Sequence, residues 1–114
     1  MTQASILLVE DEALIRMMLG EMVEKLGHRV IAEAGRSFAE IEGYDLAILD
    51  INLHGTSVAR VAEAVRSQGL PFFFLSGYGS KGVPGGFEGT VLLKPCTLET
   101  LKHTIDAVLP NGET

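Results

Sequence analysis

Acidic residues directly follow two apolar runs of this sequence, at positions where a charged side chain is unexpected. Glu10 and Asp11 come directly after ILLV at positions 6–9, and Asp50 ends the run that starts with LAIL at positions 46–49. An unpaired carboxylate in a core is costly, so each group must be either solvated or used. Carboxylates brought close together repel unless a cation joins them, and a few hard oxygen ligands suit Mg²⁺. If the fold brings the three together, they predict a magnesium site.

Two further polar side chains follow apolar runs later in the chain. Ser76 comes after FFFL at positions 72–75, and Lys94 comes after TVLL at positions 90–93. A hydroxyl and an ammonium are suitable donors to the oxygens of a phosphoryl group, and a carboxylate is a possible nucleophile. Asp50 as nucleophile, with Ser76 and Lys94 as donors, would suit phosphoryl transfer.

Each of these residues also has a simpler interpretation. Glu10, Asp11 and Glu12 could complement the dipole and cap a following helix, and Asp50 could be a solvated strand end. Ser76 precedes a glycine and could belong to an ordinary turn, and a lysine is often a surface charge. The coincidence of all these side chains at successive strand ends favours a site.

The elements that must position these residues are short apolar runs alternating with segments of helical period. The expected strands are residues 6–9, 29–34, 46–49, 72–75 and 90–93. Apolar stripes at helical spacing follow three of them: Ile15, Leu19, Met22, Val23 and Leu26; Val58, Val61, Ala62 and Val65; Leu98, Leu101, Ile105 and Val108. Gly27 is expected to end the first helix and Thr97 to cap the last. This alternation predicts an α/β fold with a mostly parallel sheet, whose strands end at one edge.

Two connections contain little helical material. SFAE at positions 37–40 is a possible capping box for a very short second helix that Gly43 ends. The segment from Gly77 to Gly89 holds six glycines and Pro84, so a fourth helix is expected to be degenerate or absent. We expect this segment to be mobile before activation.

Length, charge and composition exclude several classes of protein. The chain has 114 residues, a formal net charge of −6 and one cysteine, Cys96. The length suits one domain, residues 1–114, and no output domain is expected. Negative charge argues against a nucleic-acid partner, and the lack of a long apolar run or leader argues against a membrane partner. A lone cysteine forms no intrachain disulfide and suits a reducing compartment, so we expect a cytoplasmic protein. A monomer is also expected.

Two apparent motifs do not support a cofactor or a zinc site. Residues 77–82 spell G-x-G-x-x-G after a strand, but VPGG follows where a dinucleotide fold would begin a helix. The three histidines, His28, His54 and His103, lie on separate elements without ligand spacing.

With these residues at these positions, the chain resembles a response-regulator receiver domain of bacterial two-component signalling over nearly all of its length. The resemblance implies a flavodoxin-like, doubly wound five-stranded parallel sheet with strand order 2-1-3-4-5. It implies that Glu10 and Asp11 are the acidic pair for Mg²⁺ and that Asp50 is the phosphoacceptor. It also implies that Asn52 offers its backbone carbonyl to the metal.

The same resemblance assigns roles near the phosphoryl group. Ser76 and Lys94 would contact the phosphoryl oxygens, and Pro95 would follow a cis peptide bond that aims the lysine inward. The implied phosphodonor is a histidine kinase or a histidine phosphotransfer protein.

Several positions depart from the family pattern. The stretch PFFFLSGYG at 71–79 resembles the "FAT GUY" subgroup of receivers, with Leu75-Ser76 where Ala-Thr is usual. Receivers usually have an aromatic switch residue three positions before the lysine, but this chain has Val91 there. Tyr78 is the expected replacement, and Cys96 stands where an aromatic residue is usual.

We therefore expect a stand-alone response regulator that catalyses only its own phosphorylation and dephosphorylation, and that acts through a partner or as a phosphate relay or sink. One alternative is a Mg²⁺-dependent phosphatase of the haloacid-dehalogenase type, which also uses an aspartate nucleophile. Asn52 stands where that family usually has a general acid, which disfavours it. A second alternative is a pseudo-receiver that binds partners without phosphorylation.

Overall fold

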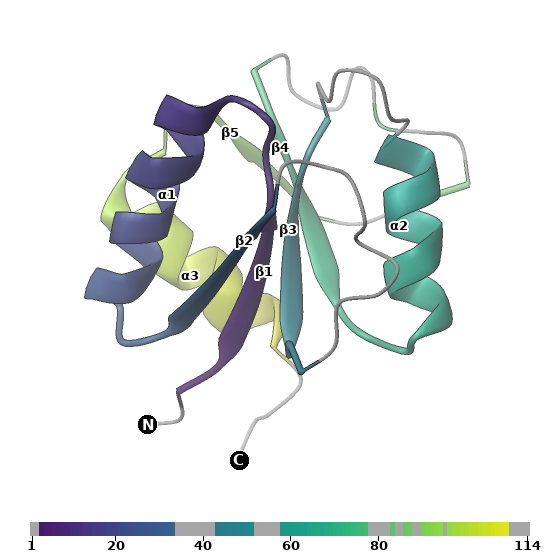
Figure 1. The fold of residues 1–114 in the computed structure, drawn as a ribbon, viewed down its shortest axis with the longest axis horizontal. Coiled ribbons are helices and arrows are strands. Elements are labelled where there is room, and N and C mark those ends of the chain that lie inside the picture. Colours follow the sequence, from purple (N-terminus) through teal and green to yellow (C-terminus); the bar gives the residue numbers. More distant parts are fainter. Residues whose placement is uncertain are drawn as a thin grey trace.

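The computed structural model describes residues 3–33, 43–51, 58–77, 83, 86, 87, 90–94 and 96–109. Five strands form one sheet, and three helices of the described residues flank it (Figure 1). The strands are β1 (Ser5–Val9), β2 (Arg29–Glu33), β3 (Leu46–Asp50), β4 (Phe72–Ser76) and β5 (Val91–Leu93). The helices are α1 (Ala13–Lys25), α2 (Val58–Ser67) and α3 (Leu98–Val108). Each predicted strand is confirmed, with ends that differ by one residue.

The sheet is parallel throughout, with the order β2-β1-β3-β4-β5. This is the doubly wound, flavodoxin-like arrangement, and the predicted fold is confirmed. Asp50 pairs with Leu75, and Ser76 pairs with Leu93, so the carboxyl ends of the central strands lie level with one another.

Apart from Ser5, Asp50 and Ser76 at their ends, the central strands are apolar, as expected for strands with helices on both faces of the sheet. Alternate side chains of a strand point to opposite faces. In β1, Ile6 and Leu8 pack with α1 and α3, whereas Leu7 and Val9 pack with α2. Figure 1 shows the same layers, with α1 and α3 on one side of the sheet and α2 on the other. Strands buried on both faces need this continuous apolar pattern.

The helix ends agree with the predicted signals. Gly27 has a φ of 94° just after α1, a conformation that glycine adopts at little cost. Thr97 is the N-cap of α3, where its hydroxyl accepts a hydrogen bond from the Thr100 amide in a reciprocal capping box. At the start of α1, Glu12 occupies the N-cap position, but its side chain makes no capping hydrogen bond. The simpler interpretation of the acidic residues as caps is therefore not supported at Glu12.

The two connections with little helical material are described only in part. The expected short helix at 37–40 lies outside the described residues. Between β4 and β5 the structure describes only Gly77 and positions 83, 86, 87 and 90, and none of these is helical. Val83 and Phe87 are half-buried and pack against the core on the α2 side of the sheet. None of the helices among the described residues has the length and apolar character needed to cross a membrane.

Candidate functional site

Three carboxylates meet at the carboxyl edge of the sheet, as the sequence predicts. One carboxylate oxygen from each of Glu10, Asp11 and Asp50 lies within 4.8 Å of the other two. The side chains of Glu10 and Asp50 are almost completely buried, at 1% and 2% exposure, and Asp11 is half-buried. Their burial argues against a merely solvated strand end at Asp50.

The strand register explains why these residues meet. β1 and β3 are parallel neighbours in which Val9 pairs with Leu49. The residue after each member of this pair is acidic: Glu10 follows Val9, and Asp50 follows Leu49. The register therefore places the two acidic residues side by side. Apolar pairing farther down the strands thus holds two carboxylates in contact.

Lys94, which follows β5 at the edge of the sheet, brings the balancing positive charge. Its Nζ lies 3.0 Å from Oδ1 of Asp50 and 3.4 Å from Oε1 of Glu10. Its backbone amide donates to the carbonyl of Ser76 at 2.8 Å, and the buried Ser76 ends the adjacent strand β4. The structure therefore brings together the side chains of Glu10, Asp11, Asp50 and Lys94, and it places Ser76 at the end of the strand between Asp50 and Lys94.

The electrostatics of the site follow from burial. Burial raises the pKa of Glu10 from 4.5 to about 7, and a hydrogen bond with Asp50 and its negative charge act in the same direction. The amide of Glu12 donates to Oε2 of Glu10 at 3.1 Å and opposes this increase. For Lys94, burial favours the neutral amine, but the hydrogen bond to Asp50 and the charges of both carboxylates outweigh it and raise the pKa.

This set of donors fits a hard divalent cation. The three carboxylates lie together at this edge, and Lys94 forms ion pairs with two of them, Glu10 and Asp50. Closely spaced carboxylate oxygens with an excess of negative charge are the ligands that Mg²⁺ prefers. Three predictions concern positions outside the described residues: the backbone carbonyl of Asn52 as a metal ligand, the switch role of Tyr78, and the cis peptide before Pro95.

Arg16 also supports the site, although the sequence did not single it out. Its Nη1 donates to the backbone carbonyl of Glu10 at 2.7 Å, so the first turns of α1 are tied to the end of β1. A possible signal was its place one turn after the N-cap, on the helix that follows the acidic residues.

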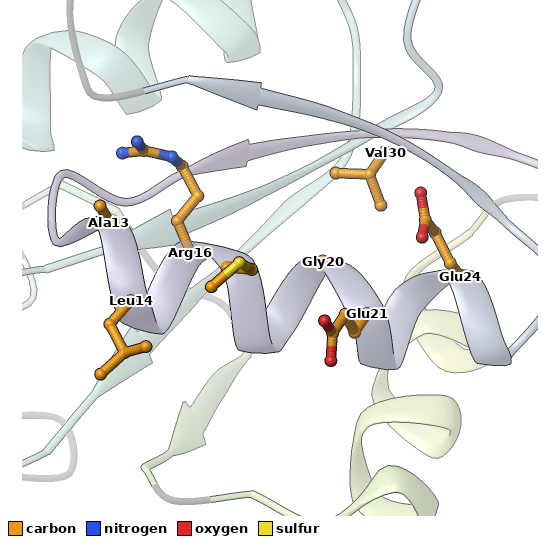
Figure 2. Close-up of a pocket in the computed structure, with 8 residues that line it drawn as sticks. Ala13, Leu14, Arg16, Gly20, Glu21, Glu24 and Val30 are labelled. Atoms are coloured by element: carbon orange, nitrogen blue, oxygen red, sulfur yellow. The ribbon is translucent and has the colours of Figure 1, made fainter.

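An apolar surface and a groove lie on α1 beside the site. Leu14, Met17 and Met18 are 62%, 57% and 56% exposed, although the spacing of large apolar residues usually indicates burial. The groove between α1 and β2 has a volume of about 700 Å³. Figure 2 shows Arg16 near the start of α1, Glu21 and Glu24 toward its other end, and Val30 across from them. The lining residues are Ala13, Leu14, Arg16, Met17, Gly20, Glu21, Glu24 and Val30.

Comparison with known sequences identifies relatives in signalling, while no family model matches the chain. The two-component response regulator PhoP of Pseudomonas aeruginosa is 32% identical over an alignment of 115 residues. The alignment covers 91% of this chain and 51% of PhoP. The transcriptional regulatory protein PdtaR of Mycobacterium tuberculosis is 42% identical over 53 residues, 42% of this chain and 26% of PdtaR. The chain thus spans about half the length of PhoP.

Comparison with solved structures gives neighbours of nearly the same length. The receiver domain of the PhyR response regulator of Erythrobacter litoralis has a TM-score of 0.80 at 27% identity, covering 98% of this chain and 96% of that one. SdrG of Sphingomonas melonis Fr1 has a TM-score of 0.78 at 35% identity, with coverages of 94% and 98%. The response regulator TrrA of Thermotoga maritima, solved in complex with Mg²⁺-BeF, has a TM-score of 0.82 at 25% identity, with coverages of 94% and 100%.

PhoP matches 91% of the chain, and the three solved structures match 94% or more of it with the same fold. The chain therefore belongs to the receiver domains of two-component response regulators.

Proposed function

We propose that this receiver domain accepts a phosphoryl group on Asp50 in a Mg²⁺-dependent reaction. The observation that carries the proposal is the position of Asp50, which lies buried between the carboxylate of Glu10 and the ammonium of Lys94 at the edge of the sheet. The complex of the related TrrA with Mg²⁺-BeF supports the same chemistry.

The proposed reaction transfers a phosphoryl group from a phosphohistidine. A carboxylate oxygen of Asp50 attacks phosphorus, the P–N bond breaks, and the leaving imidazole keeps the bonding electrons and takes a proton. The product is an acyl phosphate on Asp50. Lys94, already 3.0 Å from this carboxylate, stabilises charge that develops on the phosphoryl oxygens, and the hydroxyl of Ser76 donates to them. Attack by water at phosphorus later releases inorganic phosphate and restores the carboxylate.

The metal belongs to the same proposal. Glu10, Asp11 and Asp50 would hold Mg²⁺ through carboxylate oxygens, with the backbone carbonyl of Asn52 as a further ligand. When bound, Mg²⁺ supplies positive charge that offsets the repulsion between an incoming phosphoryl group and the carboxylates.

The proposed partner is a histidine kinase or a histidine phosphotransfer protein, met in the cytoplasm. The exposed apolar surface of α1 begins at Leu14, close to Asp11, and Arg16 ties this helix to Glu10. A donor that presents a phosphohistidine to Asp50 lies beside this surface, and we assign it to donor docking. The acidic side chains of Glu21 and Glu24 at the groove favour a donor with basic side chains around an apolar helix. They disfavour a second copy of this chain, whose net charge is −6.

The phosphorylated domain would act by binding a target or by passing the phosphoryl group onward, and it would catalyse only reactions of its own aspartate. A haloacid-dehalogenase-type phosphatase remains the alternative enzyme, and a pseudo-receiver the alternative binding module. The pseudo-receiver is disfavoured because all five residues of the site are present and the side chains of Glu10, Asp11, Asp50 and Lys94 converge.

Phosphorylation by a small-molecule donor tests the proposal without a partner. Incubation with acetyl phosphate and Mg²⁺ is expected to add one phosphoryl group, visible by intact-mass spectrometry, as acetate leaves. EDTA and Asp50→Asn should each abolish the addition, whereas Asp106→Asn, a change at an exposed aspartate of α3 paired with Lys102, should not. A phosphorylated Asp50→Asn protein would show that another residue is the acceptor.

A further inference from the structure

Phe87, which lies between β4 and β5 in the chain, packs against β4. The ring of Phe87 meets the rings of Phe72 and Phe74 edge to face, with centroids 6.2 Å and 6.5 Å away. The guanidinium carbon of Arg66, on α2, lies 4.4 Å from the centroid of Phe87. Cation–π contact and aromatic packing therefore hold the same ring from a helix and from a strand. These four residues, together with Gly86, are called the clamp below.

Gly86 allows one arginine to hold both the ring and the backbone. Nη1 of Arg66 donates to the carbonyl of Gly86 at 3.3 Å. Gly86 has a φ of 87°, in the left-handed region where a side chain is strained. That turn presents the Gly86 carbonyl and the Phe87 ring to the same guanidinium. Glu63, one turn earlier on α2, forms an ion pair with Arg66 and helps to orient it.

β5 is the element that depends most on such an anchor. It has three residues and pairs only with β4, at the edge of the sheet. Its side chains are half-buried at Val91 and Leu92 and exposed at Leu93, so burial contributes little to holding it. The first hydrogen bond of the pairing runs from the amide of Phe74 to the carbonyl of Thr90 at 3.0 Å. Phe87 lies three positions before that bond.

The other end of β5 carries Lys94. The last hydrogen bond of the pairing joins the Lys94 amide to the Ser76 carbonyl at 2.8 Å, and the Lys94 side chain then reaches Asp50. A displacement of this short strand along β4 would move the ammonium relative to Asp50. By contrast, Glu10 and Asp50 are placed by the pairing of β1 with β3, and Asp50 also by the pairing of β3 with β4, and neither pairing involves β5.

We propose that the clamp is a positioning element for Lys94: Arg66 and Phe87 fix β5 against β4 and thereby fix the lysine ammonium against Asp50. The inference rests on the proposed phosphorylation of Asp50. Under this proposal the site has two parts, and different strands position each of them. The carboxylates for the metal depend on β1 and β3, and the ammonium for the phosphoryl group depends on the clamp.

Substitutions in the clamp should separate phosphoryl transfer from metal binding. Phe87→Leu and Arg66→Gln are expected to slow phosphorylation by acetyl phosphate by about tenfold, because small displacements of a positioned group reduce rates strongly. Mg²⁺ affinity, measured by titration calorimetry, should not fall, since its carboxylate ligands lie at the ends of β1 and β3 and a displaced Lys94 ammonium would repel the metal less. Arg66→Lys keeps a cation near the ring but loses the planar fork, so its rate should lie between those of wild type and Arg66→Gln.

Two controls match these changes. Arg60→Gln removes an exposed arginine from the same helix, and Val108→Ala removes half-buried apolar volume at the far end of α3. Both should leave the phosphorylation rate unchanged. Hydrogen exchange of the Lys94 amide, which donates to Ser76, reports the fit of β5 without any phosphodonor. It should accelerate in Phe87→Leu and Arg66→Gln and not in the controls.

The outcomes are distinguishable. Unchanged rates and unchanged Lys94 exchange in both clamp variants would overturn the inference. A loss of Mg²⁺ affinity in step with the rate would also overturn it, because the clamp would then support the whole fold. If the wild-type protein gains no phosphoryl group, the proposed function fails, and Lys94 exchange alone decides whether the clamp positions the lysine.

Discussion

At the scale of the residue, Glu10 shows how the fold holds a buried carboxylate next to a second one. It is fully enclosed at the end of β1, where it faces Asp50 from β3, Lys94 after β5 and the Glu12 amide. Apolar pairing of the strands holds the two carboxylates together despite their repulsion. The carboxylates are therefore arranged for a cation before any cation binds.

The first prediction concerns the pH dependence of stability in EDTA. The folded-state pKa of Glu10 is raised from 4.5 to about 7, so the folded protein keeps a proton that the unfolded chain releases between these values. The resulting stability is fully present below 4.5 and is lost as the pH rises through about 7. At about 1.4 kcal/mol per pKa unit, the loss is on the order of 3 kcal/mol. Urea unfolding of wild type and Glu10→Gln across this range measures it as the difference between the two curves. Parallel curves would contradict the assignment to Glu10.

At the scale of the element, α1 has apolar residues on two sides. Leu19 and Val23 are buried against the sheet, while Leu14, Met17 and Met18 face outward at spacings of three and four residues. An isolated exposed leucine is ordinary, but three large side chains within two turns form a patch suited to a partner. Methionine adapts its shape to different surfaces, which suits a docking surface.

The second prediction separates docking from chemistry. Met17→Glu should leave phosphorylation by acetyl phosphate unchanged, because the side chain is 57% exposed on α1 and is not one of the proposed site residues. Transfer from a phosphorylated histidine kinase that serves the wild-type protein should fall by about tenfold or more, which corresponds to ~1.4 kcal/mol. Leu98→Glu, at a less exposed apolar position on α3, is the control and should retain transfer. Equal transfer to Met17→Glu and wild type would rule out the α1 surface as the docking site.

At the scale of the whole molecule, the strand order makes distant parts of the chain meet. Glu10 and Lys94 are 84 positions apart and interact across one edge of the sheet. A cation bound between strands that begin so far apart stabilises the folded chain alone, because the unfolded chain does not hold its ligands together.

The third prediction follows from this linkage. Mg²⁺ at millimolar concentration should raise the melting temperature of the wild-type protein. Asp11→Asn removes one of the repelling carboxylates, so it should stabilise the metal-free protein by about 1 kcal/mol, roughly 4 °C in melting temperature. The variant should respond little to Mg²⁺. Asp106→Asn should respond as wild type does. A variant at Asp11 that melts and responds like wild type would place the metal elsewhere.

Much of the architecture was predictable because it depends on neighbours in the chain. Continuous apolar runs locate β1, β3 and β4, Gly27 ends α1, and Thr97 caps α3, since each signal acts over a few residues. The position of Asp50, Ser76 and Lys94 at one edge was also predictable, because residues at the carboxyl ends of parallel strands lie at the same edge of the sheet.

Tertiary structure decided what depends on contacts between distant residues. Three features depend on elements that meet only in the folded sheet. They are the hydrogen bond from Arg16 to the Glu10 carbonyl, the raised pKa of Glu10, and the contact of Arg66 with the Phe87 ring. Local pattern specifies which side of an element is apolar, but it does not specify what covers that side. The outward stripe of α1 has the same composition as a buried one, and the packing of the other side against the sheet leaves it exposed.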